Sequence, residues 1–347
     1  SLGANLHARN MPRNQAVQRT DIVSDIPDAG VNDETLVNAW GLAFNPKGIA
    51  WISSNEEGIS EVYDEEANHV IPSVMIPGVP DAGSPSAPTG QVFNADSSSF
   101  DGDRFIFVTE DGVISGWQPP SDGGASATAT LRVNNSASGA NYKGVTLLSA
   151  CNHPAHLYAA NFSGSVDVFD ASYAPVTTTG GFVDPNMPAG FAPFNVQAFR
   201  GMLIVTYALR NDEGDDEAGP GNGFVNLFDS EGSLIQRLIS QGALNSPWGV
   251  AVTPAHFGRI PHRLLIGNFG DGIVNIYRVM GPALHRRAVH EGTLVDTQGK
   301  TLVIDGLWAL AFGPGTGGFE SDELYFTAGP NDEAQGVFGE LKIPEVK

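Results

Sequence analysis

The sequence predicts an all-β protein, a six-bladed β-propeller with four-stranded blades. Two observations support this prediction. A short motif, in which a small residue and a tryptophan lead into an apolar run, occurs as NAWGLAF at 38–44, SPWGVAV at 246–252 and GLWALAF at 306–312. The segments that follow the motif also return in the same order along the chain, which is the pattern of a repeat protein.

Six units can be aligned on one anchor position, and neighbouring anchors lie 49 to 60 residues apart. The anchor residues are Trp40, Thr89, Lys143, Phe194, Trp248 and Trp308. β-Sandwiches do not repeat at this period, and no helical stretch connects the strands as a barrel of parallel strands requires. A ring of six units fits the pattern best.

Each unit holds three short runs rich in β-branched and aromatic residues, split by Gly, Asn and Asp, which is typical of antiparallel strands joined by turns. In chain order the units are NAWGLAF, IAWISSNEEG and ISEVYD; PTGQVF, RFIFVTEDG and VISGWQ; YKGVTLL, HLYAANFSG and SVDVFD; APFNVQAF, MLIVTYA and GFVNLFD; SPWGVAV, RLLIGNFGDG and IVNIYR; GLWALAF, ELYFTAG and GVFGEL. A weaker fourth strand follows in most units, as in HVIPSVMI, TATLRV, LIQRLIS and GTLVDT. The glycine of the innermost run allows close approach near the ring axis.

The sixth unit has no fourth strand of its own, and the segment QRTDIVSDI at 18–26 belongs to no unit. We expect this segment to supply the missing outer strand of the last blade, because closing the ring in this way also hides a sheet edge. Residues 1–17 then form an N-terminal extension, and residues 18–347 form a single propeller domain.

The formal net charge of −21, from 39 acidic and 18 basic residues, disfavours partners that are themselves polyanions. Nucleic acid and anionic membrane surfaces are therefore not expected to bind. No run of about 18 apolar residues occurs, so we expect no membrane insertion. Cys151 is the single cysteine, which excludes an internal disulfide. A closed ring has no obligatory interface, and we expect a monomer.

The P-x-G strand starts and the polar loops after the second strands resemble NHL-repeat propellers and the gluconolactonase and senescence-marker propellers. Longer stretches are similar to a largely uncharacterised family of predicted-secreted six-bladed propellers, some with a C-terminal sorting tail. These stretches are DIVSDIP, LVNAWGLAF, FVTEDGVISGW, YAANFSGSVDVFD, GGFVDPNMPAGFAPFNVQ, ALNSPWGVAVTPAHFG, LLIGNFGDGIVNIY, IDGLWALAFG and YFTAGPNDEAQGVFGEL. The resemblance implies a propeller fold and an exported protein, extracellular or periplasmic, and it implies no agreed reaction.

One face of the ring is expected to collect the functional side chains. In propellers of this kind the anchor residues open the innermost strands, and the loops between second and third strands lie at the same end. The loop residues are Asn55, Glu56, Glu110, Asp111, Asn161, Tyr207, Asn268, Asp271, Asn331 and Asp332. In the gluconolactonase-like family the anchors are Glu, Asn or Asp and hold a divalent metal. The anchors here are poor ligands and Lys143 repels cations, so we do not expect that metal or the lactonase mechanism.

The anchors instead predict an aromatic-lined mouth that binds a small organic or carbohydrate ligand, since flat aromatic faces suit sugar rings. The expected ligand-binding residues are Trp40, Trp248, Trp308, Phe194, Thr89, Asn55, Asn161 and Asn268. The alternative is that the tryptophans pack between blades, as we expect for Trp51 and Trp117, which lie inside strands.

If the mouth is catalytic, a metal-independent lyase, isomerase or hydrolase is the expected class. Lys143 would then act as a base or electrostatic clamp, with Glu110 or Tyr207 as proton donor or acceptor. The alternative for Lys143 is a solvated lysine of the channel without a catalytic role. The alternative function is a propeller that binds a ligand or a partner protein without catalysis.

The acidic run NDEGDDEAGPGNG at 211–223 is long enough to be a lid over this face. If the protein binds a metal ion, we expect Ca²⁺ held by the carboxylates of this run. The candidate ligands are Asp212, Asp215, Asp216 and Glu217. The spacing does not match an EF-hand, so a solvated acidic loop is the simpler interpretation. We expect no cofactor other than Ca²⁺. We assign the histidines, including His69 and His290, to structural or surface positions.

Overall fold

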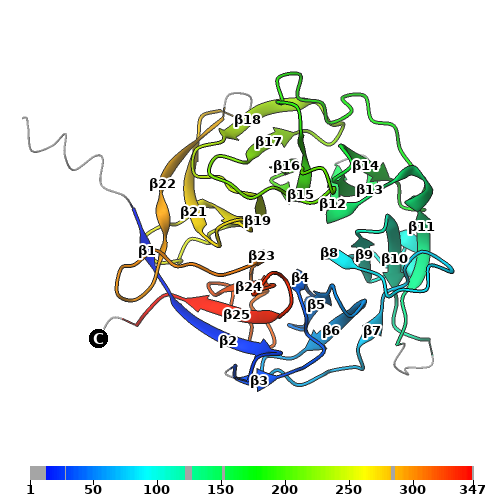
Figure 1. The fold of residues 1–347 in the computed structure, drawn as a ribbon, viewed down its shortest axis with the longest axis horizontal. Helices are drawn as coiled ribbons and strands as arrows, with labels where there is room; N and C mark the ends of the chain where they lie inside the picture. Colours follow the sequence, from blue (N-terminus) through cyan, green and yellow to red (C-terminus); the bar gives the residue numbers. More distant parts are fainter. Residues whose placement is uncertain (1–12, 28, 122–126, 151–152, 283–285, 346–347) are drawn as a thin grey trace, which may run out of the picture.

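Short strands form six small, predominantly antiparallel sheets, which lie around a common axis as the blades of a ring (Figure 1). The structure is a computed structural model that describes residues 13–27, 29–121, 127–150, 153–282 and 286–345. Cys151 lies outside the described residues. The predicted six-bladed architecture is therefore confirmed.

The strand bounds follow the predicted units closely. Blade 1 contains β4 (Ala39–Phe44), β5 (Ala50–Ser54), β6 (Ile59–Tyr63) and β7 (Val74–Met75). Blade 2 contains β8 (Pro88–Phe93), β9 (Phe105–Thr109), β10 (Val113–Trp117) and β11 (Thr130–Asn134). Blade 3 contains β12 (Tyr142–Ala150), β13 (His153–Asn161) and β14 (Ser165–Phe169), and blade 4 contains β15 (Phe191–Phe199), β16 (Met202–Leu209), β17 (Phe224–Phe228) and β18 (Leu234–Ser240). Blade 5 contains β19 (Pro247–Val252), β20 (Leu264–Asn268), β21 (Val274–Met280) and β22 (Arg287–Val295), and blade 6 contains β23 (Leu307–Phe312), β24 (Leu324–Ala328) and β25 (Val337–Lys342).

The N-terminal segment closes the ring as expected. Strand β2 (Gln18–Ser24) pairs antiparallel with β25, from Gln18 opposite Lys342 to Ser24 opposite Val337. A short strand, β3 (Val31–Asn32), then runs parallel to β2 at the outer edge of blade 6 (Figure 1). Strand β1 (Gln15–Ala16), which we placed in the extension, pairs in parallel with β22 and joins blade 5.

Glycines of the innermost strands let neighbouring blades approach one another near the axis. A Cβ atom on Gly41 would lie 2.3 Å from the carbonyl oxygen of Thr89, and one on Gly90 would lie 2.8 Å from the Cα atom of Gly144. Any larger residue at these two positions would push the blades apart, since real Cβ atoms do not approach so closely.

Farther from the axis, apolar clusters fill the space between blades. Trp51 of blade 1 stacks on Phe105 of blade 2 at 4.0 Å between ring centroids, and it contacts Trp117 at 4.7 Å. Trp51 and Trp117 are buried, which confirms their predicted packing role. In the part of the chain that the structure describes, no helix has the length and apolar character to span a bilayer.

Candidate functional site

The aromatic anchor residues meet at the ring axis and close the central channel. Together with buried Phe162 and partly buried Phe269 from two loops, they form a cluster that is called the aromatic plug here: Trp40, Phe162, Phe194, Trp248, Phe269 and Trp308. Trp308 stacks between Trp40, at a centroid distance of 3.5 Å, and Phe269, at 3.9 Å. Trp248 packs edge-on against both tryptophans, at 6.3 and 6.0 Å.

The expectation of an open aromatic mouth therefore needs correction. Trp40 and Trp308 are each 1% exposed and Trp248 is 5% exposed, so their rings contact one another instead of solvent. The physical reason is distance: six inner strands bring their first side chains so close to the axis that large rings fill the space. In this structure the three tryptophan rings pack against one another at the axis.

A hydrogen-bonded network of polar side chains lies against the plug at the strand-entry end of the axis. We call it the axial network, and its members are Asn38, Asn55, Glu110, Lys143 and Glu333. The Lys143 ammonium donates to Glu110, whose Oε2 accepts from Nδ2 of Asn55 at 3.1 Å. Asn38 Nδ2 donates to Asn55 Oδ1 at 3.2 Å and to Glu333 Oε2 at 2.6 Å. Blades 1, 2, 3 and 6 thus contribute to one network.

The network and the plug are joined directly. The indole Nε1 of Trp308 donates to Asn38 Oδ1 at 2.8 Å, and Nε1 of Trp248 donates to the carbonyl oxygen of Lys143 at 3.0 Å. The Lys143 ammonium lies 5.3 Å from the centre of the Trp40 ring, where it gains a cation–π attraction. The Lys143 side chain is only 4% exposed. The alternative of a solvated channel lysine is therefore wrong for this structure.

Glu333 has the pKa best suited to proton transfer near neutrality. Burial raises the pKa of Glu333 to about 7, and repulsion by Glu110 and Asp216 acts in the same direction. The hydrogen bond from Asn38 and the positive charge of Lys143 oppose this rise. A carboxyl group of this kind, close to half protonated at pH 7, can both donate and accept a proton.

The backbone that carries Glu333 is strained. Asn331, Asp332 and Glu333 have φ values of 58°, 52° and 65°, which form three consecutive left-handed residues. Residues other than glycine pay on the order of 1 kcal/mol each in this region, with asparagine and aspartate the most tolerant. The turn begins with a hydrogen bond from the Asn331 amide to Asp305 Oδ2 at 2.9 Å. Strain of this kind persists where surrounding contacts hold it, as the Asn38 hydrogen bond does here.

The acidic loop reaches the axial network from blade 4, consistent with a lid. Asp215 Oδ1 lies 3.9 Å from the Lys143 ammonium. Burial raises the pKa of Asp216, whose Oδ2 atom is buried without a hydrogen-bond partner. Asp212 and Glu217 are exposed. Within the described residues, these four carboxylates do not form a group of three with ligand atoms within 4.8 Å of one another.

The other predicted site residues hold turns or pack in the core. Thr89 Oγ1 donates to the carbonyl oxygen of Tyr142 at 2.7 Å, and Asn161 Oδ1 accepts from the backbone amides of Asn141 and Ser163. Asn268 Nδ2 donates hydrogen bonds to Asp271 Oδ1 and to the carbonyl oxygen of Ala243. Tyr207 packs in the apolar cluster between blades 3 and 4, and burial raises its pKa strongly. The structure does not bring Tyr207 together with Glu110 and Lys143.

Two members of the network, Asn38 and Glu333, were absent from our expectations. The sequence does contain a signal for Asn38. The residues two places before the three anchor tryptophans are Asn38, Ser246 and Gly306. In the structure these residues have positive φ angles of 49°, 45° and 66°, respectively. Asn, Ser and Gly in one repeated position indicate a left-handed residue that turns the chain into the inner strand. Glu333 follows the expected pair Asn331 and Asp332 directly, but no pattern distinguishes it.

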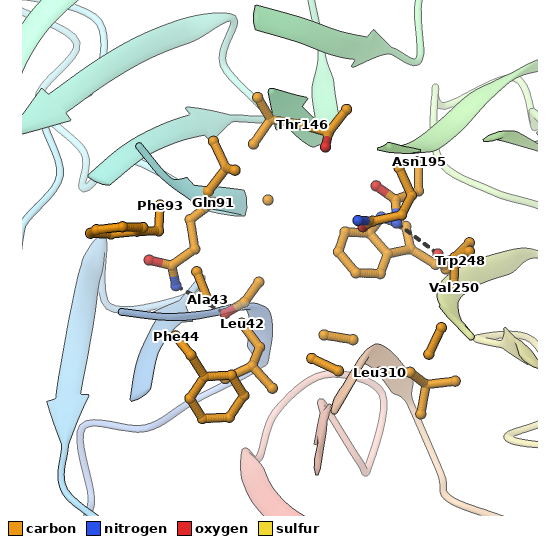
Figure 2. A pocket seen from close by; sticks show the side chains of 18 of the residues that line it. Leu42, Ala43, Phe44, Gln91, Phe93, Thr146, Asn195, Trp248, Val250 and Leu310 are labelled. Atoms are coloured by element: carbon orange, nitrogen blue, oxygen red, sulfur yellow. Dashed lines mark hydrogen bonds between the residues drawn. The ribbon is translucent and has the colours of Figure 1, made fainter. Parts of the chain in front are cut away.

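A cavity of about 530 Å³ occupies the axis on the other side of the plug. It is called the axial funnel here, and it is lined by the inner-strand residues that follow the anchors, with Trp248 reaching it from the plug (Figure 2). Polar lining groups include Gln91, whose Nε2 donates to the Gly41 carbonyl oxygen at 3.0 Å, and Asn195, whose Nδ2 donates to the Trp248 carbonyl oxygen at 2.8 Å. The funnel is thus separate from the axial network.

The fold and site define a six-bladed propeller with a polar network at one end of its axis and a funnel at the other. No family model matches the chain. Uncharacterized proteins R648 and L690 of Acanthamoeba polyphaga mimivirus are 26% and 27% identical to it over 329 and 333 residues, covering 90% of this chain and 76% and 82% of theirs.

Solved structures with a similar fold include enzymes. A streptogramin B lyase matches with a TM-score of 0.52 at 11% identity, covering 94% of this chain and 97% of that one. The soluble aldose sugar dehydrogenase of Escherichia coli matches with a TM-score of 0.58 at 13% identity, covering 95% of this chain and all (100%) of that one. A likeness at such low identity supports the fold alone.

Proposed function

We propose that the axial network binds a small organic or carbohydrate ligand and transfers a proton to or from it, with Glu333 as the acid–base group. The observation that carries this proposal is the pKa of Glu333, about 7, in a carboxyl group that is held in place by Asn38 and by a strained turn. Groups matched to neutral pH and fixed in position are what general acid–base catalysis requires. A metal-independent lyase, isomerase or hydrolase remains the proposed class.

The charges around Lys143 favour a neutral or cationic ligand over an anion. Lys143 is paired with Glu110, and Glu333, Asp215 and Asp216 lie nearby. Carboxylates outnumber the ammonium, so an anionic ligand would meet net repulsion. In this proposal the Lys143–Glu110 pair sets the charge next to Glu333, while Asp215 and Asp216 belong to a loop that must move when a ligand enters.

The test is calorimetric titration with a panel of neutral sugars, uronates and aromatic acids at several pH values. We expect binding of a neutral member whose affinity changes around pH 7. Glu333→Gln should remove that pH dependence, and Lys143→Met should shift it to higher pH, because Lys143 lowers the pKa of Glu333. Glu320→Gln, an exposed glutamate of the same blade, is the matched control. A bound ligand that shows the same pH dependence in Glu333→Gln would exclude the proposed acid–base role.

A second candidate function is non-catalytic binding in the axial funnel. Its volume of about 530 Å³ suits a small ligand, and both apolar and amide groups line it. The exposed lining residue Gln197 offers a test, because Gln197→Phe would narrow the funnel without touching the axial network. Loss of binding in this variant, with binding intact in Lys143→Met, would favour the funnel.

We also propose that the protein is exported and monomeric. Its net charge of −21 and the resemblance to predicted-secreted propellers support this. Fractionation of the producing cells tests the first part, and light scattering coupled to size-exclusion chromatography tests the second.

A further inference from the structure

Far from the axial network, two carboxylates and one imidazole converge where the ring is closed. Asp33 follows β3, Glu61 belongs to β6 of blade 1, and His69 lies between β6 and β7. His69 Nε2 lies 2.9 Å from Asp33 Oδ2, and His69 Nδ1 lies 3.4 Å from Glu61 Oε2. One ligand atom from each residue falls within 4.8 Å of the other two, the single set of this kind among the described residues.

Neighbouring hydroxyl groups orient both carboxylates. Glu61 accepts hydrogen bonds from Thr35 Oγ1 at 2.7 Å and from Ser73 Oγ at 2.9 Å. Asp33 Oδ2 accepts from the Tyr63 hydroxyl at 2.7 Å, and its Oδ1 accepts from the backbone amide of Thr35 at 3.0 Å. Outer partners that fix ligand orientation in this way are a regular part of metal sites.

The corresponding place in blade 4 is built differently and needs no ion. There Asp184 precedes the first strand, Asn226 takes the third-strand position that Glu61 has in blade 1, and Arg237 comes from the outer strand. Arg237 Nε donates to Asp184 Oδ2 at 2.9 Å, and Asn226 Nδ2 donates to the same oxygen at 2.9 Å. One carboxylate therefore meets one permanent cation.

Blade 1 has an additional carboxylate, and no guanidinium among the described residues pairs with either of them. The Glu61 side chain is 0% exposed and that of Asp33 is 11% exposed. His69 is the one basic side chain that pairs with them in the described structure, so two carboxylates share a single imidazole. Buried carboxylates are normally paired with cations or coordinate metals.

We propose that Asp33, Glu61 and His69 bind a divalent transition-metal ion of the Zn²⁺ type, which fastens the ring-closing N-terminal segment to blade 1. Imidazole and carboxylate groups are common Zn²⁺ ligands, and three protein ligands leave one position for water. Asp33 connects the site to β2 and β3 of blade 6, whereas Glu61 and His69 belong to blade 1. The ion would therefore hold the first and last blades together, a role independent of the proposed function.

The experiment compares metal binding and melting of the full chain after removal of metals by a chelator. We expect one Zn²⁺ per chain in equilibrium dialysis and a higher melting temperature with Zn²⁺ but not with Ca²⁺. The decisive variant is His69→Arg, which provides the permanent cation that Arg237 provides in blade 4. It is expected to fold without metal, to bind Zn²⁺ at least tenfold more weakly and to melt at the same temperature with and without Zn²⁺.

His290→Gln is the control for adventitious binding, because His290 contacts Asn275 and no carboxylate in the described structure, and it is expected to bind Zn²⁺ like the original chain. Absence of stoichiometric Zn²⁺ in the original chain would overturn the proposal. Unchanged Zn²⁺ affinity in His69→Arg would overturn it as well. Glu61→Gln places an amide where blade 4 has Asn226. This variant should also bind Zn²⁺ more weakly than the original chain, which tests the site independently of His69.

Discussion

The indole of Trp308 and the side chain of Asn38 are joined by a 2.8 Å hydrogen bond across 270 residues of sequence. Asn38 also donates to Asn55 and to Glu333. One buried amide thus connects the aromatic plug to the axial network and the first blade to the last. Its geometry depends on a left-handed backbone at Asn38, with φ of 49°.

Asn38→Ala should destabilise the protein by about 2–4 kcal/mol. The variant leaves the Trp308 indole and two network partners without their hydrogen bonds, and each buried unsatisfied group costs about 1–3 kcal/mol. Alanine also pays for the left-handed backbone, a cost that Asn38→Gly avoids. Urea denaturation should therefore rank the original chain above Asn38→Gly and Asn38→Ala last. A loss below about 0.5 kcal/mol in Asn38→Ala would contradict the role of this hydrogen bond.

Glu333 should make the protein less stable as the pH rises from about 5 to about 8. The pKa of Glu333 is about 7 in the folded protein and near 4.5 in the unfolded chain, so the folded state binds more protons between these values. Stability therefore falls as pH increases through this window, by on the order of 3 kcal/mol for this group. Chemical denaturation of the original chain and Glu333→Gln at several pH values isolates the effect. Parallel curves for the two proteins would contradict it.

Lys143→Met should raise the pKa of Glu333 further, because the positive charge of Lys143 lowers it in the original protein. It should also destabilise the fold by about 1–3 kcal/mol, since Glu110 loses the cation that it accepts from. Adding Glu110→Gln should recover part of this loss, because the remaining group is then uncharged. Carbon-13 NMR of the Glu333 carboxyl measures the first effect, and a double-mutant cycle measures the second. Lys47→Met, at an exposed lysine, is the control.

Trp308→Ala should cost about 3–5 kcal/mol, because it removes the ring that stacks between Trp40 and Phe269. Trp308→Phe keeps an aromatic ring but loses the hydrogen bond to Asn38, and it should cost less. Thermal melting with both variants tests the packing role. If the tryptophans mainly served as a ligand surface, Trp308→Ala would leave the melting temperature nearly unchanged.

Val23→Asp should prevent closure of the ring. Val23 lies in β2, is fully buried and faces the apolar cluster between blades 6 and 1. A carboxylate in that cluster has no described cation to pair with, so we expect a loss of more than about 4 kcal/mol or failure to fold. Val31→Asp, in the exposed part of β3, should change the unfolding free energy by less than about 0.5 kcal/mol. If Val23→Asp and Val31→Asp changed solubility and melting temperature equally, β2 would not be the strand that closes the ring.

The repeat made the blades and their closure predictable. The anchors, the inner glycines and the free segment at 18–26 were enough to place β2 beside β25, because every unit repeats the same strand pattern and the last unit lacked its outer strand. The fourth strand of blade 3 was less clear, and the structure has only a bridge there, between Phe169 and Pro175. Weak apolar patterns at the outer edge carry little information, since these strands pack on one side only.

The site was predictable in part. Lys143 and Glu110 do meet at the strand-entry end, as their repeat positions implied. The tryptophans of the same positions were expected to face a ligand, yet they face one another, because the size of the central space depends on how closely six blades approach. His69 was assigned to a structural or surface position, and its proximity to Asp33 and Glu61 depends on where the closing segment passes.

The sequence by itself determined the number of blades, the strand that closes the ring and the end at which Lys143 and Glu110 lie. These follow from short-range patterns of apolar residues, glycines and turns that repeat along the chain. Only the tertiary structure decided that the aromatic rings form a plug and that Glu333 meets Asn38 across 295 residues. The raised pKa of Glu333 likewise exists only in the folded ring, since it comes from burial and from charges that separate blades bring together.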